Sequence, residues 1–341
     1  MLLLTPAISN SVKIMRIGII GAGWIADKMG LTLRDFPQMR YAIAARDLSR
    51  AQDFAARWGF QKAYGSYEEM VSDPDVDLVY VATPHSHHYE HCMLALTHGK
   101  AVLCEKAFMA NTAETEAVLK YAEEHKLFIT EAIWTRYMPL SLKVREVIES
   151  GVIGKPLMLS ATIGYPMGWK DRIQKPELCG GSLLDIGVYA INFARMYFGE
   201  DYEEVSGHCV QNELGMDLQN TICIKYKDGR MANLQSTAIA ANDLQGIISC
   251  SDGFLVVDNI NNPQTATVYN VDHDVIARYN ADGKITGYEY QVFACEEALS
   301  KGWLESPYMP HAETIKVMKM MDALRKEWGV VYPNDKRCLE K

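Results

Sequence analysis

The sequence predicts a two-domain α/β protein: a parallel sheet flanked by helices, then an α+β domain on a large, mostly antiparallel open sheet. Three observations support this. Apolar runs alternate with helical segments up to about residue 137, strand-like runs follow one another beyond residue 150, and 341 residues exceed what one core usually serves. We divide the chain into an extension (1–14), a first domain (15–137), a second domain (138–308) and a C-terminal helix and tail (309–341).

The composition is that of an ordinary globular protein, with 48% hydrophobic and 23% charged residues. The formal net charge of −9 argues against a nucleic-acid partner, which would need a broad basic surface. No apolar run reaches the roughly 18 residues of a membrane helix, and residues 1–14 lack the basic region of a signal peptide. Eight cysteines without a C-x-x-C pair indicate reduced thiols in a cytoplasmic protein.

The first strand, expected over residues 16–20, leads directly into a glycine turn and a helix. In a Rossmann dinucleotide-binding domain the first glycine permits the tight turn and the second lets the pyrophosphate approach. A third small residue, here Ala26, lets the helix pack closely on the strand. Such turns also join ordinary strands and helices, but the strand before this one favours a cofactor site. Its expected members are Gly21, Gly23, Trp24 and Ile25.

Two arginines follow the second strand, which is expected over residues 41–45. Arg46 stands at the strand end, and Arg50 lies one helical turn further on. Two guanidinium groups can flank a 2′-phosphate, so the pair favours NADP as the cofactor. The alternative is a solvated arginine pair, with Asp47 binding the ribose hydroxyls of NAD.

Four histidines crowd the end of the strand expected over residues 76–81. They are His85, His87, His88 and His91. Since no cysteine or acidic residue at ligand spacing completes a set, we expect no metal and prefer a turn that faces the ligand pocket. We predict that Thr83, Pro84, His85 and His88 contact the cofactor, with the two histidines on its nicotinamide side.

A lysine follows the strand expected over residues 100–104. Glu105 and Lys106 stand at the carboxyl end of this parallel strand, where open α/β sheets bind their ligands. We expect both residues at the cofactor and Lys106 to face a nicotinamide and a sugar-like or diol substrate. A solvated loop lysine is the alternative. A helix over 111–125, capped by Asn111, and a strand over 128–131 complete this domain.

Beyond a connecting helix (139–150), strands follow one another with few helices between them. They are expected over 157–163, 204–210, 221–226 and 231–237, with a hairpin turn at Asp228-Gly229. The run 221–226 is apolar on much of both faces. An open sheet with an apolar outer face is a natural dimer surface, so we expect a homodimer or a higher homo-oligomer.

Asp185 and Tyr189 follow a glycine turn and are four residues apart, so they share one face of a helix. That face offers a carboxylate and a proton donor for carbonyl or alcohol chemistry. Without further evidence, a simpler explanation is that Asp185 caps or hydrogen-bonds locally and that Tyr189 packs in the core.

Together these segments resemble the Gfo/Idh/MocA oxidoreductases. The resemblance rests on the glycine turn, Arg46, Thr83-Pro84, Leu103-Cys104-Glu105-Lys106, Glu131 to Arg136, and Asp185 to Tyr189. It extends from about residue 15 to 333 and is strongest for the branch of the dimeric dihydrodiol dehydrogenases and glucose-fructose oxidoreductase. One departure is Ala107, where the family usually has proline.

The resemblance implies an NADP-dependent oxidoreductase that transfers hydride between nicotinamide C4 and a carbinol or carbonyl carbon of a sugar, polyol or cyclic trans-diol. It implies that Lys106, Tyr189 and Asp185 are catalytic, with the lysine ammonium lowering the pKa of the tyrosine. Asp185 would orient the substrate hydroxyl or Lys106, and Trp134 and Arg136 would wall the substrate. The alternative is a cofactor-binding sensor of the same fold without turnover. The resemblance also implies that the final amphipathic helix packs back near the first domain.

Overall fold

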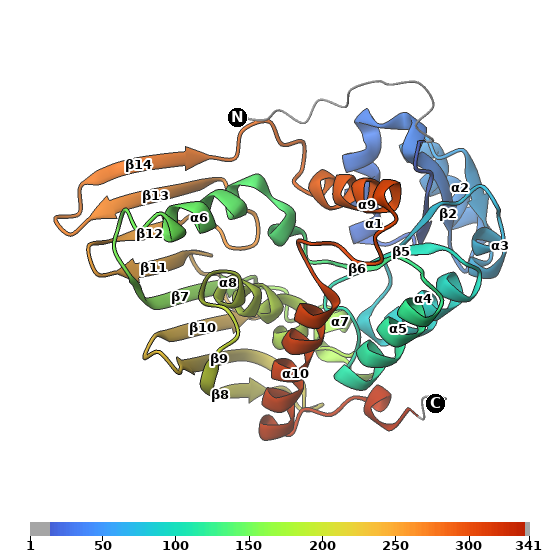
Figure 1. Cartoon of the computed structure of the whole chain (residues 1–341). Coiled ribbons are helices and arrows are strands. Elements are labelled where there is room, and N and C mark those ends of the chain that lie inside the picture. Colours follow the sequence, from blue (N-terminus) through green and yellow to red (C-terminus); the bar gives the residue numbers. More distant parts are fainter. Residues whose placement is uncertain (1–13, 338–341) are drawn as a thin grey trace.

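The computed structural model describes residues 14–337, so the predicted extension lies almost wholly outside the described residues. Figure 1 shows two sheets, one at each side of the molecule. The strands of the first are β1 (Ile17–Ile20), β2 (Arg40–Ala44), β3 (Lys62–Tyr64), β4 (Leu78–Val81), β5 (Ala101–Glu105) and β6 (Ile129–Ala132). All pair in parallel in the order β3-β2-β1-β4-β5-β6. The strand order reverses beside β1, so the crevice at the carboxyl ends of β1 and β4 is where such a sheet binds ligands.

Helices cover both faces of this sheet, which explains why its central strands β1, β4 and β5 are buried at every position. The helices are α1 (Trp24–Thr32), α2 (Leu48–Trp58), α3 (Tyr67–Val71), α4 (His88–Thr97) and α5 (Thr112–Glu124). Asn111 caps α5 as predicted, because its side chain accepts a hydrogen bond from the N–H of Glu114 at 2.9 Å.

The second sheet is large, open and mostly antiparallel, as predicted. Its strands are β7 (Pro156–Gly164), β8 (Tyr202–Gln211), β9 (Asp217–Tyr226), β10 (Met231–Thr237), β11 (Gly246–Cys250), β12 (Gly253–Val257), β13 (Thr265–Asn270) and β14 (Val275–Asn280). The order is β14-β13-β12-β11-β7-β10-β9-β8, and only the β7/β10 pair is parallel. The strands β11 to β14 were not predicted from the sequence.

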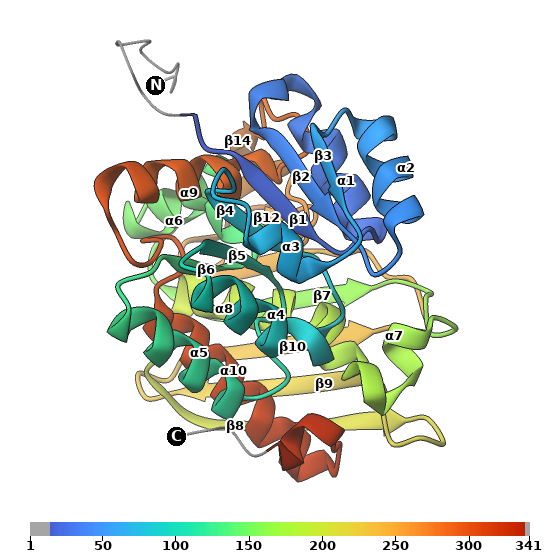
Figure 2. The same cartoon turned by 90° about the vertical axis from the view of Figure 1, so that its right-hand side faces the viewer.

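One face of the second sheet carries the helices α6 (Pro139–Glu149), α8 (Val188–Phe198) and α10 (His311–Trp328). Figures 1 and 2 both show α8 lying across the middle of the sheet. The short helix α7 (Asp171–Gln174) follows β7, and a π-helical turn (Leu183–Gly187) leads into α8. Among the described residues, no helix is long and apolar enough to cross a bilayer.

Helix α9 (Glu289–Lys301) departs from the predicted domain division. The range 138–308 assigns it to the second domain, but Val292, Cys295 and Ala298 lie in one buried cluster with α1 and the first sheet. The division by sequence overlooked this because an amphipathic helix does not reveal which sheet it covers. Helix α10 packs between α5 and β8, and the turn Pro333–Lys336 follows it.

Candidate active site

Lys106, Asp185 and Tyr189 meet where the carboxyl end of β5 faces the start of α8. The Nζ of Lys106 donates a hydrogen bond to the main-chain oxygen of Asp185, 79 residues further along the chain. The same ammonium lies over the ring of Tyr189, 4.9 Å from its centroid. Burial lowers the pKa of Lys106, while the neighbouring Asp185 and Glu105 oppose that change. The structure thus brings together the three residues expected to be catalytic.

The segment that carries Asp185 is held by an aspartate that the sequence analysis did not single out. Asp217, fully buried on β9, accepts the N–H of Leu183 at 2.8 Å, at the start of the π-helical turn. A side chain at Gly181 would collide with Asp217, and the glycine has a φ of +114°. Single π-turns inside helices often occur at functional sites.

Arg172, on α7, is a member of this site that the sequence analysis missed. Its guanidinium forms an ion pair with the Oδ1 of Asp185. Burial raises the pKa of Asp185, but the cations of Lys106 and Arg172 outweigh it and hold the pKa below its usual value. The other carboxylate oxygen, Oδ2, is buried and has no hydrogen-bond partner among the described residues. No spacing in the sequence connects an arginine of this short helix with a residue 13 positions later.

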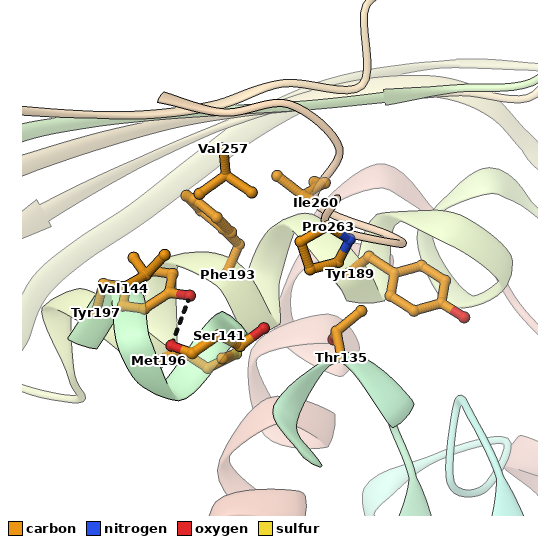
Figure 3. A pocket seen from close by; sticks show the side chains of 10 residues that line it. All are labelled: Thr135, Ser141, Val144, Tyr189, Phe193, Met196, Tyr197, Val257, Ile260 and Pro263. Carbon is orange, nitrogen blue, oxygen red and sulfur yellow. Dashed lines mark hydrogen bonds between the residues drawn. The ribbon is translucent and has the colours of Figure 1, made fainter. Parts of the chain in front are cut away.

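The hydroxyl of Tyr189 accepts a hydrogen bond from the Nε1–H of Trp134 at 3.0 Å. Figure 3 shows the ring at the end of a narrow, mainly apolar cavity, with the hydroxyl pointing away from it. The prediction that Lys106 lowers the pKa of Tyr189 is wrong. Burial raises that pKa well above its usual value of about 10, and Tyr288 and Glu105 raise it further. The ammonium lies over the ring, and the raised pKa keeps Tyr189 protonated at neutral pH.

Trp134 lies at the site with one face covered. Its ring stacks on Tyr288 with centroids 3.9 Å apart and planes inclined by 2°, and only 4% of Trp134 is exposed. Gly287, with a φ of +99°, brings the backbone close to the indole. Tyr288 was not predicted, because it follows a loop with no motif.

Arg136, expected to wall the substrate, is buried and bonded to protein side chains. It is 6% exposed, and its guanidinium donates to Asn192 at 2.6 Å and to Glu313 at 2.6 Å. The turn Trp134–Tyr137 is a 3₁₀ helix, in which side chains two positions apart point in different directions. Arg136 therefore joins the turn to α8 and α10.

His85 and His88, expected on the nicotinamide side of the cofactor, have their ring nitrogens against backbone oxygens. The ring nitrogens of His85 lie 3.3 Å from the oxygen of Cys179 and 3.2 Å from that of Lys106. Those of His88 lie between the oxygens of Thr83, Ala107 and Phe108 at 2.8–3.0 Å. Burial lowers the pKa of His85 to about 3 and also lowers that of His88. Each neutral ring carries a single N–H and donates to the backbone on one side only, and the neighbouring Lys106–Ala107 peptide bond is cis.

Glu105 lies beneath this turn and not in an open cleft. Its carboxyl accepts hydrogen bonds from the Tyr80 hydroxyl and from the Lys106 N–H, the latter at 3.3 Å. Burial raises the pKa of Glu105 to about 7. Its contacts are those of a residue that supports Lys106.

The glycine turn fits a dinucleotide. Gly21 has a φ of +98° and donates to the oxygen of Ala44 at 3.0 Å. Gly23 precedes α1, whose start has no side-chain cap, and a side chain at Gly23 would meet only open space. The unbonded N–H groups and this space suit a pyrophosphate. Trp24 is 65% exposed and Ile25 half-buried at the same turn.

Two arginines and an aspartate follow β2 beside the glycine turn. Arg46 and Arg50 are exposed, and the guanidinium of Arg50 reaches the oxygen of Ala22 in the glycine turn at 3.2 Å. Asp47 instead caps α2, since it accepts hydrogen bonds from the N–H and hydroxyl of Ser49 at 2.9 Å. Those bonds hold the pKa of Asp47 below its usual value.

Two further residues complete this end of the sheet. Thr83 lies against Gly21, and its hydroxyl is 2.9 Å from the Nδ1 of His91, while Pro84 is exposed. Within residues 14–337, no group of three or more His, Cys, Asp or Glu side chains is placed to hold a metal ion.

Two family models match the chain and cover both domains. The oxidoreductase family with an NAD-binding Rossmann fold matches residues 15–132, and the GFO/IDH/MocA C-terminal domain matches residues 141–256. The chain belongs to the Gfo/Idh/MocA oxidoreductase family. It is therefore an NAD(P)-binding dehydrogenase or reductase.

Curated members of this family match along nearly the whole chain. The trans-1,2-dihydrobenzene-1,2-diol dehydrogenase of Homo sapiens is 34% identical over 95% of this chain and 99% of its own length. The enzyme of the same name from Xenopus laevis is 33% identical over 93% and 98%.

Solved structures of Gfo/Idh/MocA type share the fold. A 3-ketoreductase from Actinomadura kijaniata in complex with NADP and TDP-benzene superposes with a TM-score of 0.83 at 24% identity, covering 92% of this chain and 98% of that chain. A levoglucosan dehydrogenase in complex with NADH and L-sorbose gives 0.81 at 20% identity, covering 92% and 96%. These relatives are dehydrogenases and reductases, and none of them favours the sensor alternative.

Proposed function

We propose that the protein transfers hydride between a nicotinamide nucleotide, preferably NADP, and a carbinol or carbonyl carbon of a sugar, polyol or cyclic trans-diol. The observation that carries this proposal is the meeting of Lys106, Asp185 and Tyr189 at the carboxyl edge of the sheet that bears the glycine turn. The diol in the name of the curated relatives and the sugar-related compounds in the neighbouring structures support the substrate class.

Each of these side chains has a task in the proposed reaction. The bound nicotinamide supplies or accepts the hydride. In reduction, the neutral Tyr189 hydroxyl donates its proton to the carbonyl oxygen, and in oxidation the reverse transfer occurs. Lys106 supplies positive charge where that oxygen becomes negative. Asp185, kept ionised by Lys106 and Arg172, offers its unpartnered Oδ2 to a substrate hydroxyl. The stacked Trp134 and Tyr288 provide an apolar wall.

The proposal is tested by following nicotinamide absorbance with NADP and a panel of sugars, inositols and cyclic diols, and with NADPH and the matching carbonyl compounds. We expect turnover with at least one vicinal diol or its ketone. Tight NADPH binding without turnover of any compound, in either direction, would favour the sensor alternative.

NADP preference rests on Arg46 and Arg50. Replacing both with alanine should weaken NADPH binding by about 10- to 100-fold, because two charged hydrogen bonds to the 2′-phosphate are lost. NADH binding, measured by the same fluorescence titration, should change little. Arg57→Ala is the matched control, since this arginine lies on the same helix and pairs with Asp27 at 2.9 Å. Tighter binding of NADH than of NADPH by the wild type would contradict the assignment.

Homodimerisation through the outer face of the second sheet is a further part of the proposal. Met158 and Met231 are register partners on β7 and β10 and are 43% and 38% exposed. Ile247, Phe254 and Val256 line the same face without a covering helix. Light scattering at micromolar protein should give twice the chain mass, and the double variant Met158→Glu/Met231→Glu should give the monomer mass. A monomeric wild type would refute this part of the proposal.

We also place the protein in the cytoplasm. Supporting this, the seven cysteines within residues 14–337 form no disulfide with one another.

A further inference from the structure

The residues after α10 contact three segments next to the candidate active site. We call residues 332–337 the C-terminal strap. The Tyr332 hydroxyl donates to the oxygen of Gly180 at 2.7 Å. The Asn334 amide donates to the oxygen of Ser86 and to the carboxylate of Glu114, both at 3.0 Å, and accepts from the thiol of Cys179 at 3.4 Å. One side chain thus joins the β4–α4 turn, α5 and the segment that leads to Asp185.

These contacts lie one step from Lys106 and Asp185. The ring of His85, next to Ser86, lies between the main-chain oxygens of Cys179 and Lys106, 3.3 and 3.2 Å from its two nitrogens, and its single N–H donates to one of them. Cys179 has a φ of +53°, a left-handed conformation that non-glycine residues seldom adopt and that needs support from neighbours. The strap and His85 provide that support.

The strap itself is firmly held. Arg325 of α10 binds Asp335 at 3.0 Å and lies over the ring of Tyr332, 4.2 Å from its centroid. Asp335 in turn accepts the N–H of Tyr332 at 2.8 Å. Tyr332 is 1% exposed and Asn334 8%, so solvent cannot readily replace their hydrogen bonds. The strap therefore presents hydrogen-bonding groups at fixed positions to both domains.

We propose that Asn334 is a positioning residue that holds Cys179, through its thiol, against Ser86 and thereby sets the separation of Lys106 and Asp185. This inference rests on the proposed function of those two residues. Arg337 of the strap has a different set of contacts: it pairs with Glu114 of α5 at 3.1 Å and lies over the ring of Tyr89, both in the first domain. Loss of the Asn334 side chain should therefore change the relative position of Lys106 and Asp185, whereas loss of the Arg337 side chain should only weaken the attachment of the strap to α5.

The test compares Asn334→Ala with its matched control Arg337→Ala. Asn334→Ala should lower kcat by about 10- to 100-fold, because a small displacement of reacting groups is costly, with NADPH affinity within about threefold of wild type. With nicotinamide deuterated at C4, the kinetic isotope effect on kcat should be larger for Asn334→Ala than for wild type, because the chemical step becomes slower. Arg337→Ala should lower the unfolding temperature and leave kcat near the wild-type value. A kcat of Asn334→Ala within about twofold of wild type would overturn the inference, as would equal kcat losses in both variants.

A second pair of variants keeps the inference testable if Asn334→Ala folds poorly. Cys179→Ala removes the donor to Asn334 and should lower kcat, whereas Cys179→Ser retains a donor and should restore it. Equal kcat values for these two would contradict the inference. Acetic anhydride labelling of the protein without substrate provides a measurement that needs no turnover: Lys106 should react faster in Asn334→Ala than in wild type. Wild-type inactivity on the whole substrate panel would refute the proposed function, and unchanged Lys106 labelling would refute the role of the strap.

Discussion

Replacement of Tyr189 by phenylalanine should lower kcat by about 10²–10⁴-fold, the usual contribution of a positioned proton donor. The substitution removes one oxygen and leaves the ring in place under the Lys106 ammonium. Because burial keeps the hydroxyl protonated, it is ready to donate in reduction at neutral pH. In oxidation the phenol must first lose its proton, so the oxidation rate should rise with pH. Steady-state rates in both directions, with an NADPH titration, check this result.

Tyr197→Phe is the matched control. Tyr197 lies two turns further along α8 and lines the same cavity, but its hydroxyl donates to the main-chain oxygen of Ser141 at 3.3 Å (Figure 3). Tyr197→Phe also removes one hydroxyl oxygen, but from a tyrosine that takes no part in the proposed reaction. The kcat of this variant should therefore stay near the wild-type value. A Tyr189→Phe rate within about tenfold of wild type would remove this tyrosine from proton transfer.

Replacement of Lys106 by methionine should lower kcat by about 10²–10³-fold, as expected when a charge that stabilises a developing oxyanion is removed. Methionine retains much of the apolar stem and loses only the ammonium, which is bonded to Asp185 and lies over Tyr189. Asp185 keeps Arg172 as a partner, so the protein should fold. Combined with Tyr189→Phe, the loss should be smaller than the product of the two single losses, because both groups act on one oxygen.

Lys100→Met controls for the loss of a buried ammonium. Lys100 precedes β5, at the end of the strand opposite Lys106, and donates to the oxygens of Asp73 at 2.6 Å and Val76 at 3.0 Å. Its replacement should lower the unfolding temperature, with little effect on kcat of the folded enzyme. If Lys106→Met loses no more kcat than Lys100→Met, Lys106 has no role in the chemical step.

The parts of the site that could be predicted are those that depend on the spacing of residues close together in the sequence. A glycine turn after a strand needs only a few adjacent residues, and the four-residue separation of Asp185 and Tyr189 fixes a shared helix face. The position of Lys106 at a strand end follows from the alternation of strands and helices. The same alternation predicted five of the six strands of the first domain in their order, but not the three-residue strand β3 or the short helix α3 that follows it.

Residues brought in by tertiary packing escaped prediction. Arg172 comes from the short helix α7, Tyr288 from a loop and Asp217 from a strand of the other sheet, so no sequence interval links them to Lys106. The directions of His85 and Arg136 depend on which partners surround them in the folded protein. A motif thus identified the position of these side chains in the chain but not what they contact.

The return of α9 to the first sheet makes the amino-terminal domain discontinuous in the chain. Phe293 contacts Phe36 edge to face with centroids 5.2 Å apart, and the hydroxyls of Thr286 and Thr32 lie 2.7 Å apart. During synthesis, the apolar side of α1 therefore stays uncovered until the ribosome has made residue 301, after most of the second domain has emerged. A fragment that ends at residue 137 would expose this side to water. Chimaeras between family members consequently need crossovers on both sides of α9 as well as one near residue 137.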